Sequence, residues 1–158
     1  NELKEKFGDN NIEYIKSSEQ NILEALKVSD IVVGAVYVVG KEAPRVVLRE
    51  MINEMKPGTV MVDISIDQGG CFETSKTTTH DDPTYLINGV VHYCVANMPG
   101  SVPLTATEAL NEATLPFVID IANKGLDNSL SEDINLFNGL NLKNYEIVHK
   151  SVRESFNL

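Results

Sequence analysis

Three short apolar segments, at residues 30–36, 60–66 and 90–96, recur along this chain at intervals of about thirty residues. Apolar runs of this length, bounded by glycine and polar residues, are typical of strands that are buried inside a sheet. An interval of about thirty residues is the usual period of right-handed strand–helix–strand units, whose strands lie parallel. The sequence therefore predicts an α/β fold built around a parallel sheet.

The segments between and around these strands predict the remaining elements. Residues 45–55 have apolar side chains at the spacing of one helix face, and Lys56-Pro57-Gly58 follows as a stop signal. Before the first strand we expect a helix end closed by Gly8, a strand at 12–15 and a helix opened by Ser17-Ser18-Glu19-Gln20. After the second strand we expect a long loop at 68–86. A further helix should open near Pro103 with the capping box at 105–108, kink or restart at Pro116 and end at Gly125, and a separate tail of short elements should follow.

Composition limits the classes of partner. The formal net charge is −10, which opposes nonspecific binding to nucleic acid or to an anionic membrane surface. The chain has only 2 cysteines, Cys71 and Cys94, so it lacks the cysteine framework of small secreted domains and fits the reducing cytoplasm. Its longest apolar stretch is far shorter than the roughly 18 residues that span a bilayer. We therefore expect a small-molecule or protein partner, with no nucleic acid and no membrane.

The carboxyl ends of the three predicted strands carry the candidate site. They hold Gly34 to Tyr37, then Asp67-Gln68-Gly69-Gly70, then Asn97-Met98-Pro99-Gly100. Ligands of open parallel sheets bind beyond these ends, so all three would line one crevice. Gly69-Gly70 alone or Pro99-Gly100 alone is more simply a turn, and Asp67 alone is as readily a helix cap or a solvated loop acid. Their convergence is what favours a ligand site.

Other reactive side chains receive structural interpretations. Asp63 lies within a strand, so we expect it to accept hydrogen bonds from local backbone or a basic side chain. Cys71 has no histidine partner in the pattern and is predicted to be a structural thiol. His92 is predicted to be a hydrogen-bonded sheet residue, and His80 with its neighbouring acids to belong to a solvated loop. No G-x-G-x-x-G or G-x-x-x-x-G-K-[ST] string occurs, so the usual phosphate cradle is absent from this chain.

The chain resembles bacterial alanine dehydrogenases from Ser17 to the C-terminus, and four long strings carry the resemblance. They are D-I-V-V-G-A-V-Y-V-V-G-K-E-A-P at 30–44, V-D-I-S-I-D-Q-G-G-C-F-E-T-S at 62–75, T-T-H-D-D-P-T-Y at 78–85 and V-H-Y-C-V-A-N-M-P-G-S-V-P-L-T at 91–105. The resemblance covers only the C-terminal part of that family. It implies a partial Rossmann-type, doubly wound sheet at residues 1–125, and at 126–158 a C-terminal segment of the substrate domain.

The resemblance also implies a reaction and its residues. The family interconverts L-alanine with pyruvate and ammonia, using NAD. Asp67 corresponds to its catalytic aspartate. The implied cofactor-binding residues are Ser17, Val36, Tyr37, Ile64, Ser65, Ile66, Asp67, Lys76, Val95, Ala96, Asn97 and Met98. Lys124 stands where some relatives carry a histidine attributed to a metal contact, and no metal is predicted.

The missing amino-terminal part of that family would hold the glycine-rich phosphate turn and the residues that grip the substrate. We therefore expect the chain to work with that part or with a complementary chain, in a homo-oligomer that is a hexamer by family analogy. Alternatives are a noncatalytic remnant or interaction module, a transhydrogenase nucleotide domain, or a lysine-pathway dehydrogenase domain. The T-T-H-D-D-P-T-Y and C-V-A-N-M-P-G strings favour alanine dehydrogenase over the last two.

Overall fold

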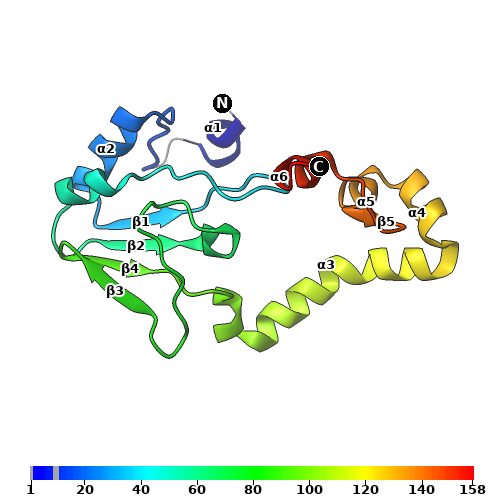
Figure 1. Cartoon of the computed structure of the whole chain (residues 1–158). Coiled ribbons are helices and arrows are strands. Elements are labelled where there is room, and N and C mark those ends of the chain that lie inside the picture. The colour runs from blue at the N-terminus through cyan, green and yellow to red at the C-terminus, as the bar shows by residue number, and fades with distance from the viewer. Residues whose placement is uncertain (1, 9–10) are drawn as a thin grey trace.

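A four-stranded sheet forms the centre of the larger part of this protein in a computed structural model that describes residues 2–8 and 11–158 (Figure 1). Its strands are β1 (Ile31–Gly34), β2 (Val60–Asp63), β3 (Thr84–Ile87) and β4 (Val90–Tyr93), in the order β1-β2-β4-β3. β1 and β2 are parallel, and so are β2 and β4. The three strands expected from the sequence are therefore adjacent and parallel, which confirms the predicted α/β class.

The fourth strand, β3, is an antiparallel addition that pairs with β4. It begins inside the segment 68–86, which the sequence predicts to be a loop, so that prediction is wrong for residues 84–86. The turn between the two strands is Asn88-Gly89, with φ of 51° and 80°. Two consecutive positive φ values match the type I′ turn of tight hairpins, for which Asn-Gly is a favoured pair.

The helical elements surround this sheet and extend away from it. The α-helices are α1 (Glu2–Phe7), α2 (Glu19–Val28), α3 (Pro103–Lys124), α4 (Leu126–Glu132), α5 (Ile134–Asn138) and α6 (Lys150–Ser155). Three 3₁₀ helices are η1 (Arg49–Glu54), η2 (Ile64–Gln68) and η3 (Met98–Ser101), and a small hairpin joins β5 (Leu142–Lys143) to β6 (Glu146–Ile147). Ser18 caps α2 by accepting a hydrogen bond from the Asn21 N–H, as the serine pair predicts.

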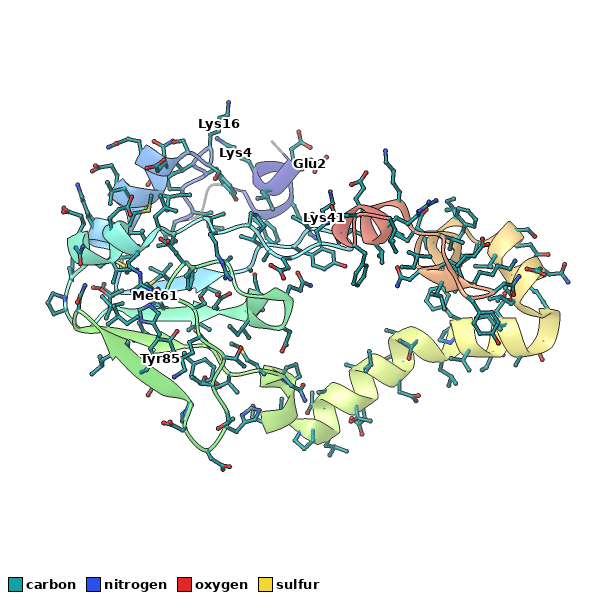
Figure 2. The ribbon with its side chains drawn as sticks, in the orientation of Figure 1. Glu2, Lys4, Lys16, Lys41, Met61 and Tyr85 are labelled. Atoms are coloured by element: carbon teal, nitrogen blue, oxygen red, sulfur yellow. The ribbon has the colours of Figure 1, made fainter. Side chains whose placement is uncertain are left out.

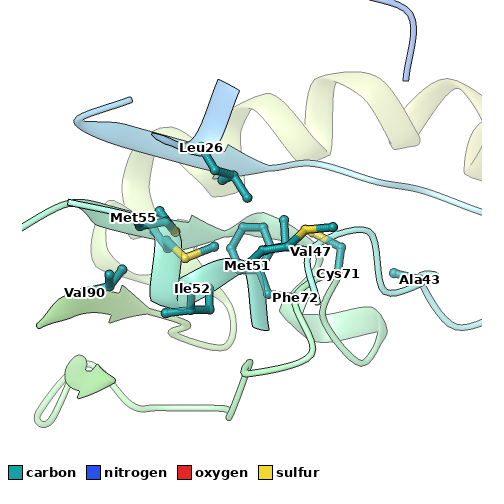
Figure 3. Close-up of a cluster of buried hydrophobic side chains, with 10 residues drawn as sticks. Leu26, Ala43, Val47, Met51, Ile52, Met55, Cys71, Phe72 and Val90 are labelled. Carbon is teal, nitrogen blue, oxygen red and sulfur yellow. The ribbon is translucent and has the colours of Figure 1, made fainter. Parts of the chain in front are cut away.

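The hydrophobic core lies between the sheet and the layer formed by α2 and η1 (Figure 3). Its buried members are Leu26, Ala43, Val47, Met51, Ile52, Met55, Met61, Cys71, Phe72 and Val90. Met61 of β2 and Phe72 are almost completely buried. This packing holds β2 in place, and the end of β2 carries the candidate site.

Several predicted boundaries are wrong for identifiable reasons. Residues 12–15 form no strand, because the described sheet offers them no neighbouring strand with which to pair. The helix expected at 45–55 is reduced to η1, since Val46 and Val47 donate backbone hydrogen bonds to the Cys71 carbonyl instead. The strand expected at 60–66 ends at Asp63, whose side chain accepts from the Ser65 N–H and starts η2.

Helix α3 leads away from the sheet to the group formed by α4, α5, the small hairpin and α6 (Figure 1). It begins at Pro103, two residues before the predicted capping box, and continues through Pro116 without a restart. Gly125 ends it with a φ of 79°, as predicted. None of the described helices is both long enough and apolar enough to cross a membrane.

Candidate functional site

The ends of the three parallel strands meet around η2. The Ser65 hydroxyl lies 2.8 Å from both the N–H and the carbonyl oxygen of Val36, which joins η2 to the chain after β1. On its other side, η2 carries Asp67, whose two carboxylate oxygens lie 3.2 and 3.3 Å from the Asn97 N–H beyond β4. The convergence that the strand pattern predicts is therefore present, with Asp67 between two strand ends.

Asp67 lies at the wall of a pocket of about 860 Å³. The lining residues come from the segment after β1, from η2 with its following glycine, and from the end of α6: Tyr37, Val38, Gly40, Lys41, Glu42, Asp67, Gln68, Gly69, Glu154, Ser155 and Phe156. Asp67 is exposed, so its carboxylate is accessible to a ligand while the Asn97 N–H holds it. The pocket thus offers the fixed acid Asp67, glycine backbone at Gly40 and Gly69, and two aromatic side chains, Tyr37 and Phe156.

Asp63 holds the loop that carries Asp67. This side chain is completely buried, and it accepts hydrogen bonds from the Ser65 N–H at 3.0 Å and the Cys71 N–H at 2.8 Å. The Ser75 hydroxyl donates to the same carboxylate. One carboxylate therefore bonds both the start and the end of the loop, which confirms the expected structural role of Asp63.

The C-terminal helix forms the far wall of the pocket. Lys41 and Glu154 form an ion pair at 2.8 Å, and the Ser155 hydroxyl donates to the Gly40 carbonyl at 3.0 Å. Figure 2 labels Lys41 beside the helix α6. The Lys41 ammonium holds the pKa of the Glu154 carboxyl below its usual value. Sequence reasoning missed this wall, because its two sides are more than a hundred residues apart and no local pattern connects them.

The buried thiol and imidazole near the sheet serve the fold. Burial, together with the negative charge of Asp63, raises the pKa of Cys71 to about 11, so the thiolate is disfavoured. His92 lies 2.8 Å from the Thr74 hydroxyl and 3.1 Å from the Val90 carbonyl, and burial lowers its pKa. A carbonyl can only accept, so Nδ1 of His92 donates to it and Nε2 accepts from Thr74. Both residues match their predicted structural roles.

The remaining predicted cofactor residues are distributed unevenly around Asp67. Ile66 and Val95 are buried in the interior, so only their backbone atoms remain for a ligand. Ser17 and Lys76 are exposed, and neither lines the pocket. Ile64 is exposed, and Ala96 and Met98 are partly buried beside Asn97. Their cofactor roles stay predictions.

The described residues include no group of three histidine, cysteine or acidic side chains that could hold a metal ion. The site around Asp67 can instead hold a polar, planar ligand between strand ends, with a carboxylate facing it. Cys71 is not an activated nucleophile, since its thiol is buried and has a raised pKa.

Comparisons with known proteins identify relatives of this chain. A family model described as "Alanine dehydrogenase/PNT, C-terminal domain" matches residues 1–150. Alanine dehydrogenase of Halomonas elongata is 51% identical over 142 residues, which cover 90% of this chain and 38% of that protein. Alanine dehydrogenase of Staphylococcus haemolyticus is 51% identical over 158 residues, which cover 99% of this chain and 42% of that protein.

Solved structures agree with these relatives. A structure of L-alanine dehydrogenase superposes with a TM-score of 0.80 at 44% identity, covering 99% of this chain and 43% of that one. Transhydrogenase from Sinorhizobium meliloti shares the fold, with a TM-score of 0.69 at 23% identity over 95% of this chain and 40% of that one. The chain spans about two fifths of the length of these relatives. On the match of nearly its whole length, it belongs to the alanine dehydrogenase/PNT C-terminal domain family.

Proposed function

We propose that this chain is the C-terminal portion of an NAD-dependent L-alanine dehydrogenase, which converts L-alanine to pyruvate and ammonia reversibly. The observation that carries the proposal is the position of Asp67, an exposed carboxylate held between two strand ends at the wall of a pocket. The family membership of the chain, and its 51% identity to a protein named alanine dehydrogenase, support the same reaction. Activity is proposed for the enzyme completed by an amino-terminal part.

The residues around Asp67 fit the nicotinamide end of NAD. Gly69 has a φ of 92° and lines the pocket, so its backbone can approach a planar ring without a side chain intervening. Val36, Tyr37, residues 64–67 and residues 95–98 would hold that end, with Ser17 and Lys76 nearer the rest of the cofactor. The glycine-rich phosphate cradle is absent from this sequence, so it would come from the amino-terminal part of a Rossmann domain.

The chemistry follows from the charge of the site. NAD, when bound, would accept a hydride from the α-carbon of L-alanine, leaving an iminium ion that water converts to pyruvate and ammonia. The Asp67 carboxylate stabilises positive charge that develops beside it. The Asn97 N–H fixes that carboxylate, so it needs little reorganisation during the reaction. Asp67 would also orient the attacking water by accepting a hydrogen bond from it.

The amino-terminal part that we propose would also cover exposed surface. β1 pairs only with β2 among the described strands, and its Ile31 and Val33 are 67% and 56% exposed. An uncovered edge strand invites aggregation, so a neighbouring strand in the completed enzyme would stabilise it. In this arrangement residues 1–125 would belong to the cofactor domain and residues 126–158 to the substrate domain. The completed enzyme would be a cytoplasmic oligomer.

The test uses a rebuilt enzyme, in which this chain is joined to the amino-terminal part of the Staphylococcus haemolyticus relative. Reduction of NAD with L-alanine is followed by absorbance. We expect turnover from the rebuilt enzyme, and a loss of about a hundredfold in kcat for Asp67→Asn with little change in the KM for NAD. Asp82→Asn, a matched change at an exposed loop acid, serves as the control.

Two results would overturn this proposal. An equal loss in kcat and in affinity for NAD on Asp67→Asn would reduce Asp67 to a binding group. A rebuilt enzyme that folds but neither binds NAD nor oxidises alanine would favour a noncatalytic interaction module. The second enzyme candidate is a transhydrogenase domain, since the family model covers both enzymes, and it would reduce a second nucleotide instead of consuming alanine.

A further inference from the structure

Two glycines form the turn that follows Asp67 and the short helix η2. Gly69 and Gly70 have φ values of 92° and 86°, which glycine adopts without strain but also leaves easily. Their N–H groups donate to the Ile66 and Ser65 carbonyls of η2, at 3.0 and 2.9 Å. Their carbonyl groups have partners elsewhere in the chain, so the direction of the Asp67 carboxylate depends on those partners as well as on η2.

Two charged side chains hold the turn and the residue that follows it. Asp63 accepts from the Ser65 N–H at the start of η2 and from the Cys71 N–H directly after Gly70. Arg45 binds the carbonyl groups: its Nη1 atom lies 2.6 Å from the Gly69 oxygen, 2.6 Å from the Gly70 oxygen and 3.3 Å from the Phe72 oxygen. A hydrogen bond from a charged donor to a carbonyl is stronger than one from a neutral donor. Arg45 thus holds both glycines by their carbonyl groups.

Gly70 lies close to both of these side chains. A β-carbon added there would stand 2.8 Å from the Asp63 carboxylate, 2.8 Å from the Ser75 β-carbon and 3.0 Å from Arg45 Nη1. The turn is therefore clamped closely enough to exclude even one methyl group. The clamp continues through η2 to Asp67, whose carboxylate in turn accepts from the Asn97 N–H on another strand end.

We propose that Arg45 is a positioning residue for Asp67. By holding the carbonyls of Gly69 and Gly70, Arg45 fixes the end of η2 and with it the direction of the Asp67 carboxylate. The catalytic consequence rests on the proposed function, whereas the effect on Asp67 itself does not. No local pattern indicates this role, because Arg45 lies in a predicted helix and its partners are 24 to 27 residues away in the chain.

The geometry also says which substitution should restore the role. All three carbonyls surround a single nitrogen, Nη1, which carries two N–H groups. A lysine ammonium carries three N–H groups on one nitrogen, so Arg45→Lys can supply the same donors. Arg45→Met keeps an apolar stem and removes every donor. Arg49→Met, at an exposed arginine four residues further along the chain, is the matched control.

The first measurement needs no catalysis. Hydrogen exchange of the Asn97 N–H in this chain reports whether the Asp67 carboxylate is in place, because that N–H donates to it. We expect Asp67→Asn and Arg45→Met each to speed exchange at Asn97 by about tenfold, with no further gain when combined. Arg45→Lys and Arg49→Met should leave it within about twofold of the original. A merely local effect of Arg45 would alter residues 69–72 and leave Asn97 unchanged.

The second measurement uses the rebuilt enzyme. Arg45→Met should lower kcat by about tenfold to a hundredfold, since a small misplacement of a reacting group costs that much, and should leave the KM for NAD within about threefold. In an Asp67→Asn background the same change should cost nothing more. Three results would overturn the positioning role. The first is a loss in kcat that multiplies in the double variant, and the second is an Asn97 exchange rate that Arg45→Met leaves unchanged. The third is an Arg45→Lys variant that behaves like Arg45→Met.

The two measurements also separate this role from the proposed function. A rebuilt enzyme without turnover overturns the dehydrogenase proposal, while the exchange rate at Asn97 still decides whether Arg45 positions Asp67. Turnover that survives Arg45→Met unchanged overturns the catalytic consequence of the clamp and leaves the dehydrogenase proposal intact.

Discussion

Replacement of Asp63 by asparagine tests how the loop under the site is held. The carboxylate accepts from the Ser65 N–H on one oxygen and from the Cys71 N–H on the other. An asparagine keeps one oxygen and turns an NH₂ group toward the second donor, so one of these two N–H groups must lose its partner. Leaving one buried donor unpaired costs about 1–3 kcal/mol.

That cost converts to a measurable rate. Since 1.36 kcal/mol is a factor of ten, hydrogen exchange at Ser65 or Cys71 should speed up by about fivefold to about 150-fold in Asp63→Asn. The N–H groups within β4 serve as an internal reference for global opening. Asp82→Asn, at an exposed loop position, is the matched control.

The outcome distinguishes local from global effects. Faster exchange at Ser65 or Cys71 with β4 unchanged supports the loop-closing role of Asp63. If both N–H groups keep their original rates, the carboxylate is not what holds the loop. If β4 accelerates to the same extent, Asp63 supports the whole sheet and the local reasoning is refuted.

Two further predictions concern packing and pH. In Gly34→Ala the new methyl group would stand 2.6 Å from the Phe72 ring and even closer to the Cys71 sulfur. Denaturant unfolding should therefore show a free energy of unfolding lower by about 1–3 kcal/mol. Gly139→Ala, whose methyl group meets nothing nearer than 3.4 Å, should cost far less. Burial lowers the pKa of His92, so the unfolded chain binds a proton that the folded chain refuses. The contribution of neutral His92 to the free energy of unfolding is therefore fully present above about pH 6.5 and falls at lower pH, by up to about 1.4 kcal/mol per pH unit. His92→Gln should reduce this slope in unfolding curves measured from pH 7.5 to 5.5.

The parts of the fold that the sequence predicts are those determined by local apolar pattern. The three parallel strands begin where their apolar runs place them, because a short apolar run bounded by polar residues and glycine is a local signal. Elements decided by tertiary contacts were missed. Residues 45–48 carry a helical pattern, yet Val46 and Val47 bond to the Cys71 carbonyl and stay extended. β3 was missed for another reason, since the Asn88-Gly89 turn that follows it is a local signal that did not enter the prediction.

The candidate site divides in the same way. Asp67 was found because a strand, an acid and two glycines are consecutive in the sequence. Arg45 and Glu154 were not, because each reaches the site through contacts with residues far away in the chain. Local sequence thus identifies the group that would face a ligand, whereas the groups that hold it become visible only in three dimensions.

The exposed apolar surface argues that the fold of this chain is one portion of a larger unit. None of the residues of α3 is buried, and Leu104, Leu110 and Val118 are 72%, 64% and 60% exposed. A helix with apolar side chains on several faces is normally enclosed by other segments. The proposed amino-terminal part would cover this helix as well as the open edge of β1. A self-sufficient interaction module would not need two such surfaces at once, so the exposure of α3 favours the completed enzyme over that alternative.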